Sequence, residues 1–289
     1  MSIRVKNLTH IYEPGLPTES VALEDVSFEI EDGELVGIIG HTGSGKSTLL
    51  QHLNGLLKPT SGQIIVGDTD ITARGVSMVE IRKRVGLVFQ YPEYQLFEET
   101  VAQDVAFGPK NLGLAREEID ERVREALELV GLPYEEVAER SPFELSGGQK
   151  RRVAIAGVIA MHPEVLILDE PTAGLDPKAH KDVLKMIEEV HRRTGNITIL
   201  VSHNMADIAR LSDKVIVIDS GRLVTVGTPY EVFSQHEKLE GVGLALPPVT
   251  QFTETLRSRG MDLSDTILSV DQAAEEIYRA LTSKGKVRI

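Results

Sequence analysis

The spacing of apolar residues changes several times along the chain, and each change predicts a different element. Residues 2–8 and 21–30 alternate apolar and polar side chains around a turn rich in proline and glycine, which predicts two antiparallel strands. Residues 34–39 form a nearly continuous apolar run, typical of a strand that is buried on both faces. A helix is expected directly after this run, over residues 46–56, so that a strand, a loop and a helix follow one another early in the chain.

The middle of the chain changes to helical spacing. Short strands are expected at 64–66 and 85–89. Farther along, apolar residues recur three or four positions apart, as they do on one face of a helix, at Ile119, Val123, Leu127 and Val130. These patterns predict that residues 91–161 form a helical insertion between two groups of strands.

Strand character returns in the second half of the chain. Apolar runs predict strands at 165–168, 197–201 and 215–218, with a helix over 177–193 between the first two. Strands that are separated by helices usually pair in parallel. The predicted fold class is therefore α/β, with a mainly parallel core sheet, an antiparallel β edge and a helical subdomain.

The apolar pattern weakens near residue 235. Residues 241–248 have the glycines and the double proline of a linker, and two short helices are expected after them, over 249–259 and 271–283. We therefore expect a main domain over residues 1–235, followed by a linker and a small α-helical C-terminal extension over 236–289.

The amino-acid composition limits the kinds of site and partner that the chain can have. The absence of cysteine from all 289 residues excludes disulfides, thiolate zinc sites, iron–sulfur clusters and a cysteine nucleophile. The net charge of −13 weighs against broad nucleic-acid binding, which needs a basic face, so no nucleic-acid partner is expected. The first residues lack the apolar core of a secretion signal, and no apolar run approaches the roughly 18 residues that suggest a transmembrane helix. Any role at a membrane is expected to depend on partner proteins.

A glycine-rich motif follows the first buried strand. The sequence Gly40-His-Thr-Gly-Ser-Gly-Lys-Ser47 matches the phosphate-loop pattern of nucleotide-binding proteins. Its glycines let backbone N–H groups approach the phosphates, Lys46 reaches the outer phosphates, and Ser47 helps to hold Mg²⁺. The predicted ATP contacts in this loop are Gly40, Thr42, Gly43, Ser44, Gly45, Lys46, Ser47 and Thr48.

A second glycine-rich motif lies about a hundred residues later. Leu145-Ser-Gly-Gly-Gln149 precedes a helix expected over 149–161, where free N–H groups and the positive end of the helix dipole attract an anion. One γ-phosphate has little need of two such cradles from the same chain. The two motifs together therefore predict a dimer, in which the nucleotide is also contacted by Ser146, Gly147, Gly148 and Gln149.

The order of these motifs resembles a known family. The phosphate loop, the LSGGQ motif, the strand that ends in Asp169 and Glu170, the motif Ala173-Gly-Leu-Asp176 and the late His203 resemble the nucleotide-binding subunit of ABC transporters. In that family the LSGGQ signature closes over ATP bound to the opposite subunit. The resemblance covers nearly all of residues 1–235, and implies a P-loop NTPase fold of the ABC ATPase type that hydrolyses ATP with Mg²⁺.

Two adjacent carboxylates follow a buried strand, at the edge where open parallel sheets bind their ligands. By resemblance to the Walker B motif, Asp169 would organise the Mg²⁺ shell, and Glu170 would orient or deprotonate the attacking water. The alternative is a charged pair at a strand end with no catalytic role.

Four further residues match positions of the family. Gln90 would contact Mg²⁺ or the water and report that state to the helical insertion, and His203 would touch the γ-phosphate. Tyr12 would stack on the adenine, and Asp176 would cross to the opposing subunit. The alternatives are a turn residue for Gln90, a structural histidine for His203, a hairpin-packing tyrosine for Tyr12 and the N-cap of a helix for Asp176.

Aromatic residues cluster just after the strand at 85–89. Five of the thirteen in the chain fall within nineteen positions, at Phe89, Tyr91, Tyr94, Phe97 and Phe107. Such clusters favour interfaces as well as cores, so packing inside the helical insertion is the alternative. Residues 91–97 are similar to the docking helix of energy-coupling-factor ATPases, which contacts a transmembrane subunit, and residues 107–113, 141–146 and 154–161 also resemble that group.

The resemblance implies a function. Within the energy-coupling-factor group the chain looks most like the second of two paralogous ATPases, which pair with each other, with a shared transmembrane coupling subunit and with a substrate-binding membrane subunit. The expected role is an ATP-hydrolysing subunit, peripheral on the cytoplasmic face of the cell membrane, that powers uptake of a vitamin or a transition-metal ion. The alternatives are a homodimer in place of a heterodimer, the ATPase of an ordinary ABC transporter, and a soluble ABC-type ATPase; the last usually carries a long coiled coil or a second cassette, and neither is present here.

Overall fold

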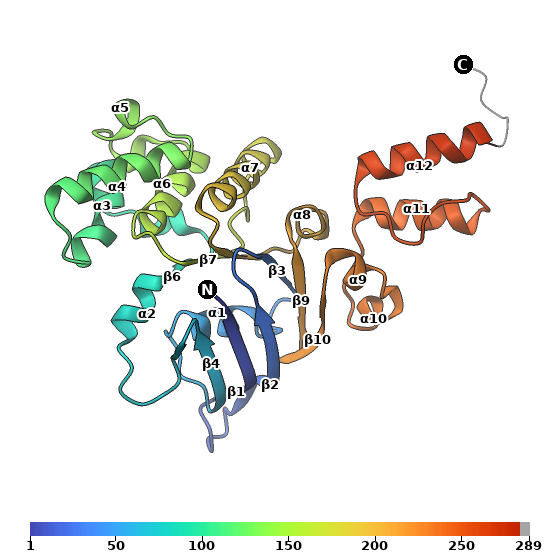
Figure 1. Ribbon diagram of the computed structural model, residues 1–289, viewed down its shortest axis with the longest axis horizontal. Helices are drawn as coiled ribbons and strands as arrows, with labels where there is room; N and C mark the ends of the chain where they lie inside the picture. The colour runs from blue at the N-terminus through green and yellow to red at the C-terminus, as the bar shows by residue number, and fades with distance from the viewer. Residues whose placement is uncertain (284–289) are drawn as a thin grey trace.

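A six-stranded sheet forms the centre of the molecule. The computed structural model describes residues 1–283 and is shown in Figure 1. The order of strands across this sheet is β10 (Arg222–Gly227), β9 (Lys214–Asp219), β3 (Leu35–Ile39), β8 (Ile197–Val201), β7 (Val165–Asp169) and β6 (Val85–Val88). Neighbouring strands run parallel except for β10 and β9, which pair antiparallel. Every residue of β3, β7 and β8 is buried, as expected for strands covered on both faces.

The antiparallel strands form a second sheet of their own. Its order is β2 (Ser20–Ile30), β1 (Ile3–Tyr12), β4 (Ser61–Val66) and β5 (Thr69–Asp70). In Figure 1 it lies below the parallel sheet, with α1 (Lys46–Leu53) near it. The predicted strands at 2–8, 21–30 and 64–66 are confirmed here, and they make a separate layer where an antiparallel edge was expected.

The region between β6 and β7 is helical, as predicted. A short helix α2 (Met78–Arg84) precedes β6. After β6 the chain forms a 3₁₀ turn η1 (Pro92–Gln95), then α3 (Val101–Asn111), α4 (Arg116–Leu129), α5 (Tyr134–Val137), a second 3₁₀ turn η2 (Pro142–Glu144) and α6 (Gly147–Ile159). In Figure 1 helices α3 to α6 gather at one end of the molecule.

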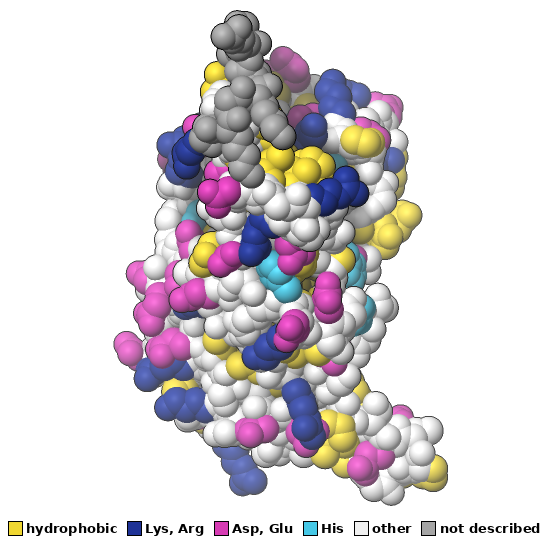
Figure 2. Space-filling model, turned by 90° about the vertical axis from the view of Figure 1, so that its right-hand side faces the viewer, with side chains coloured by type: hydrophobic (Ala, Val, Ile, Leu, Met, Phe, Trp, Pro, Cys, Tyr) yellow, Lys and Arg dark blue, Asp and Glu magenta, His cyan; other side chains and the backbone are white. Residues whose placement is uncertain are grey.

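The C-terminal helices lie at the other end. After β10 come α9 (Pro229–Phe233), α10 (His236–Gly241), α11 (Pro248–Ser258) and α12 (Val270–Ser283), so both predicted helices are confirmed within about a residue. The face on this side of the molecule mixes apolar and charged side chains (Figure 2). The expected linker is partly buried, because Leu244 and Leu246 join the main core, and the His41 side chain donates to the Val242 carbonyl at 2.6 Å. The division at residue 235 stays a prediction.

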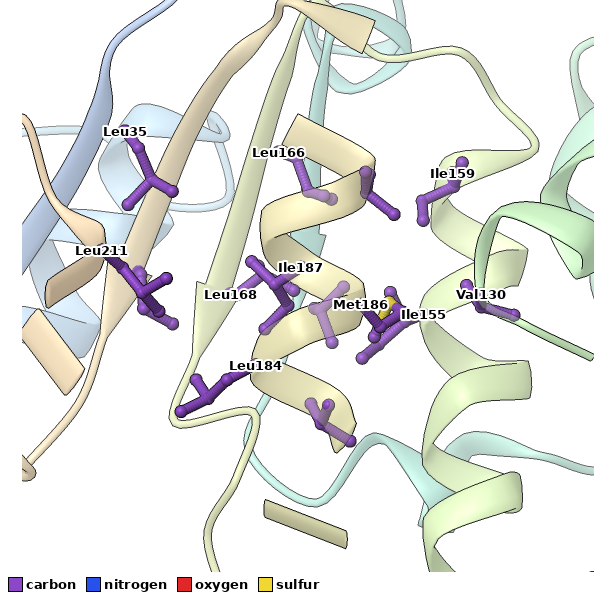
Figure 3. Packing of buried hydrophobic residues seen from close by; sticks show 14 of the residues in the cluster. Leu35, Val130, Ile155, Ile159, Leu166, Leu168, Leu184, Met186, Ile187 and Leu211 are labelled. Atoms are coloured by element: carbon purple, nitrogen blue, oxygen red, sulfur yellow. The ribbon is translucent and has the colours of Figure 1, made fainter. Parts of the chain in front are cut away.

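Two apolar clusters cover the two faces of the parallel sheet. Because side chains alternate along a strand, Val165 and Ile167 of β7 face α1 and the antiparallel sheet, whereas Leu166 and Leu168 face the helical side. Figure 3 shows this second face, where α7 (Pro177–Thr194) lies between β7 and α6. The remaining helix, α8 (Met205–Leu211), packs on β3 in the same cluster. These layers fix the strand ends from which the site is built.

Candidate functional site

The phosphate loop lies between β3 and α1, and its shape depends on glycine. A Cβ atom added to Gly40 would lie 2.1 Å from the carbonyl oxygen of Ile218 in β9, and one added to Gly45 would lie 2.5 Å from that of Ala22 in β2. Gly45 also has a positive φ of 105°, which other residues rarely adopt. The loop is therefore pressed against both sheets, with Thr42 and Gly43 exposed to solvent.

Lys46 is buried under this loop. Its ammonium group donates to the backbone carbonyls of Gly40 at 2.7 Å and His41 at 2.6 Å. Burial lowers the pKa of Lys46, and the nearby carboxylates of Glu170 and Asp169 act in the opposite direction. A cation held by carbonyls inside a loop rich in N–H groups fits an anionic phosphate chain.

Ser47 and Asp169 come together at the end of β7. The hydroxyl of Ser47 donates to Oδ2 of Asp169 at 3.0 Å. Burial raises the pKa of Asp169, and the hydrogen bond from Ser47 works against this rise. Hydroxyl and carboxylate oxygens are ligands that Mg²⁺ accepts, and Mg²⁺ commonly takes only one or two of them from protein beside phosphate and water. Residues 1–283 contain no group of three or more His, Cys, Asp or Glu residues that could hold a metal ion.

Glu170 is held from two other strands. Gln90, after β6, donates from Nε2 to Oε2 of Glu170 at 2.9 Å, and His203, after β8, lies with Nε2 2.6 Å from Oε1. The backbone of Glu170 has a positive φ of 49°, which costs about 1–3 kcal/mol in a residue other than glycine. Its N–H donates to the Val201 carbonyl of β8, which fixes this turn. The predicted residues Gln90, Glu170 and His203 are thus brought into one cluster.

Tyr12 lies at the rim of the phosphate loop. Its hydroxyl lies 3.2 Å from the hydroxyl oxygen of Thr48 in α1, and its ring packs edge-on against His10 with centroids 4.5 Å apart. The side chain is 39% exposed, so one part of the ring remains free to contact a base. This geometry includes the packing role that was the alternative for Tyr12 and leaves room for stacking.

The signature motif lies at the N-terminus of α6. Ser146 and Gln149 form a capping box, in which the Ser146 hydroxyl accepts from the Gln149 N–H at 3.3 Å and Gln149 Oε1 accepts from the Ser146 N–H at 3.1 Å. A Cβ atom on Gly147 would meet nothing within 4 Å, and one on Gly148 would lie 3.4 Å from Ala179. Within residues 1–283, no hydrogen bond joins these residues to the phosphate loop.

Asp176 caps α7. Its carboxylate accepts from the N–H groups of Ala179 at 3.0 Å and Lys178 at 2.9 Å, and these bonds lower the pKa of Asp176. The N-cap role that the sequence offered as the alternative is thus present in the single chain. The Asp176 side chain is exposed, so it remains accessible to a second subunit as well.

One buried residue of the site region was not predicted from the sequence. Arg151 of α6 is 1% exposed, and its guanidinium donates to Glu93 of η1 and to the carbonyls of Pro171 and Ala173. The signal was a charged residue four and eight positions before Ile155 and Ile159, on the buried face of α6. Its partners lie far from it in sequence, so spacing alone did not reveal them.

The aromatic cluster lies at the surface beside a hollow. Tyr94 is 83% exposed and Phe97 is 59% exposed, and the rings of Phe97 and Phe107 meet edge-on with centroids 5.0 Å apart. Phe97 and Phe107 line one side of a hollow of about 600 Å³ whose walls come from η1, α2, α3 and α6. Packing inside the helical insertion, the alternative for this cluster, does not account for such exposure.

Comparison with known proteins identifies the class that this fold and site define. Residues 23–173 match the model of the ABC transporter family. The chain is 58% identical to the energy-coupling factor transporter ATP-binding protein EcfA2 of Caldanaerobacter subterraneus subsp. tengcongensis, over 99% of this chain and all of that protein. It is 55% identical to the protein of the same name from Clostridium tetani, over 99% of each chain.

Solved structures agree with these relatives. The structure of cbiO1 from Clostridium perfringens, described as part of the ABC transporter complex cbiONQ, is 40% identical with a TM-score of 0.74, over 87% of this chain and 98% of that one. The dimeric ATP-binding cassette MJ0796, bound to ADP and Pi, is 29% identical with a TM-score of 0.68, over 78% of this chain and 98% of that one. The chain belongs to the ABC transporter family and, within it, to the energy-coupling factor transporter ATP-binding proteins.

Proposed function

We propose that this chain binds and hydrolyses ATP at a site completed by a second ATP-binding subunit, and that hydrolysis powers an energy-coupling factor importer. The observation that carries the proposal is the cluster in which Gln90 and His203 both contact the carboxylate of Glu170, beside the pair formed by Ser47 and Asp169. A catalytic carboxylate must be fixed close to the nucleotide, and here two strands other than its own fix it.

Different residues of the chain would bind ATP and catalyse its hydrolysis. The loop N–H groups and Lys46 bind the phosphates of ATP, and Tyr12 contacts the base. Glu170 orients a water molecule and accepts its proton, while His203 and Gln90 keep the carboxylate aimed at the outer phosphate. Mg²⁺, bound through Ser47, Asp169 and Gln90, would supply positive charge against the phosphate oxygens.

The proposed ATP site is shared between two subunits. The exposed signature at the start of α6 would cover ATP held by the partner subunit, and Asp176 would face that subunit. The partner proposed is a paralogous ATPase, with a homodimer as the alternative. The dimeric form reported for MJ0796 supports this arrangement.

Sedimentation velocity tests the dimer, both on the chain mixed with the paralogous ATPase and on the chain alone. In a Glu170→Gln background, ATP should assemble the chain and the paralogous ATPase into a dimer in sedimentation velocity runs, whereas dimer formed by the chain alone would indicate the homodimer. Adding Gly147→Arg should abolish this dimer, because the new side chain fills the surface that closes on ATP without disturbing the monomer. The matched control is Gly241→Arg, at an exposed glycine in α10 whose Cβ would also meet nothing within 4 Å. Equal dimer formation by both variants would contradict the proposal.

The membrane partners are proposed from the surface beside η1. Among residues 1–283 there is no helix that could cross a bilayer, so a transport role requires other subunits. The hollow lined by Phe97 and Phe107 is proposed to receive a segment of a transmembrane coupling subunit, which in turn carries a substrate-binding membrane subunit. The chain would then lie peripherally on the cytoplasmic face of the membrane, and the cargo is proposed to be a micronutrient, either a vitamin or a transition-metal ion.

Photo-cross-linking tests this docking face directly. Benzoylphenylalanine in place of Phe107 should link the chain to a small membrane protein in intact cells. The control carries the same group in place of Tyr230, an exposed aromatic residue of α9 away from the hollow. Linkage to a conventional permease would favour an ordinary ABC transporter, and loss of any membrane product at position 107 would favour a soluble ABC-type ATPase.

A further inference from the structure

A single buried guanidinium joins three segments of the helical region and the site. Arg151 of α6 donates from Nε and Nη2 to the two carboxylate oxygens of Glu93 in η1, at 3.0 and 2.6 Å. Its Nη1 donates to the carbonyl of Pro171 at 3.0 Å and to that of Ala173 at 2.6 Å. Pro171 follows Glu170 directly, so the same group contacts the segment that follows the catalytic carboxylate.

The geometry of this contact is specific to arginine. The side chain of Arg151 is 2% exposed and that of Glu93 is 16% exposed, so both charges lie largely out of water. A buried charge is tolerated only when it is paired and its donors are satisfied, and four of the five guanidinium N–H donors have acceptors here. The planar fork binds both oxygens of one carboxylate while its third nitrogen reaches two carbonyls, a fixed arrangement that the single nitrogen of an ammonium group cannot reproduce.

Arg151 connects the exposed segment 91–97 to the segment that follows Glu170. Residues 91–97 carry the exposed aromatic side chains beside the hollow, and residues 171–176 run from Glu170 to the cap of α7. The two segments also lie close together, because a Cβ atom added to Gly174 would lie 3.3 Å from the ring of Tyr91. Gln90, immediately before Tyr91, contacts Glu170. The two segments are therefore linked in two ways: Gln90 contacts Glu170 just before them, and Arg151 joins Glu93 to the carbonyls of Pro171 and Ala173.

We propose that Arg151 is a positioning residue that transmits displacement of residues 91–97 to residues 171–176 and to the start of α6. A rigid bidentate contact cannot follow one partner without moving the other, so a protein segment docked against 91–97 changes the placement of Ala173 and Asp176. The identification of 91–97 as a membrane contact rests on the proposed function, whereas the mechanical link between 91–97 and 171–176 does not.

Hydrogen exchange on the full chain tests the link itself. In a Glu170→Gln background, ATP should slow exchange at residues 40–48 and also change exchange at 91–97. Adding Glu93→Gln should remove the response at 91–97 and keep that at 40–48. The matched control is Arg124→Gln, which breaks an exposed ion pair to Glu135 of 2.6 Å in the same helical region. An undiminished response at 91–97 in the Glu93→Gln protein would overturn the inference.

Kinetics provide a readout that simple destabilisation does not move. With Glu170 intact, Arg151→Lys should lower kcat for ATP roughly tenfold with KM changed by less than about twofold, because the phosphate loop is untouched. A rise in KM equal to the loss in kcat/KM would contradict a positioning role. Should Arg151→Lys unfold, Glu93→Gln carries the same kinetic prediction. Absence of any ATP response at 40–48 in the parent would refute the proposed function, whereas a response at 40–48 without one at 91–97 would refute only this inference.

Discussion

Replacing Glu170 by glutamine tests the catalytic assignment most sharply. The substitution keeps the length and nearly the shape of the side chain but removes its charge and its ability to accept a proton. In the structure both carboxylate oxygens face N–H donors, one from Gln90 at 2.9 Å and one from His203 at 2.6 Å. A carboxamide has only one oxygen, so its NH₂ group must face one of these donors. The variant therefore loses the base and one of the contacts that aim it.

The expected loss follows from these two effects. General-base catalysis by a positioned side chain contributes about 10²–10⁴-fold, equivalent to roughly 3–5 kcal/mol in the activation free energy. The NH₂ group that faces an N–H donor adds about 1–3 kcal/mol to the cost of the substitution, unless the histidine changes tautomer. We expect kcat for ATP to fall at least about 10²-fold, with ATP affinity preserved because the phosphate loop and Lys46 are unchanged.

Phosphate release under single-turnover conditions provides the assay, together with equilibrium binding of ATP. The matched control is Glu164→Gln, which removes a surface carboxylate that pairs with Arg84 at 2.7 Å before β7, and whose kcat should stay within about twofold of the parent. A Glu170→Gln protein that releases phosphate within about threefold of the parent rate would refute the role given to Glu170.

Three further predictions concern the same structure. Burial raises the pKa of Asp169, so ionisation of its carboxyl weakens the fold as pH rises through that pKa. Without nucleotide, Asp169→Asn should therefore raise the Tm at pH 7.5 by about 2–4 °C. Differential scanning calorimetry should find this gain absent below about pH 4, where the aspartate is protonated in the unfolded chain as well. In Gly37→Ala, the new methyl group would lie 2.6 Å from Ser212 Oγ and 2.7 Å from Ile208 Cγ2, and urea unfolding should show a loss of about 1–3 kcal/mol. Tyr12→Ala should weaken ATP and GTP binding to a similar extent, roughly tenfold by calorimetric titration, and a loss confined to ATP would contradict simple stacking.

Much of the site was accessible from the sequence because its residues lie at strand ends. Gln90, Glu170 and His203 follow β6, β7 and β8, three parallel strands that are neighbours in the sheet, so one sheet edge brings them together. The positions of the glycines in the phosphate loop were likewise predictable, since the loop joins a buried strand to a helix. Local pattern and topology sufficed for these residues.

Other features depend on contacts between distant segments. Arg151 is paired with Glu93, 58 positions earlier, and no local pattern predicts a buried ion pair of that separation. The separation of the antiparallel strands into their own layer depends on how α1 and both sheets share one apolar cluster. The short elements α2, α8, α9, α10, β5 and β10 were not predicted, because few apolar positions mark elements of two to seven residues.

The composition of the native complex decides whether the chain works as one subunit of a membrane importer. The chain, carrying an affinity tag, would be purified in mild detergent from its own cell membranes, and every protein that stays bound would be identified by mass spectrometry. We expect a second ATP-binding subunit of the same family together with two different membrane proteins, one of them the coupling subunit. Recovery of the chain without any membrane protein would contradict it.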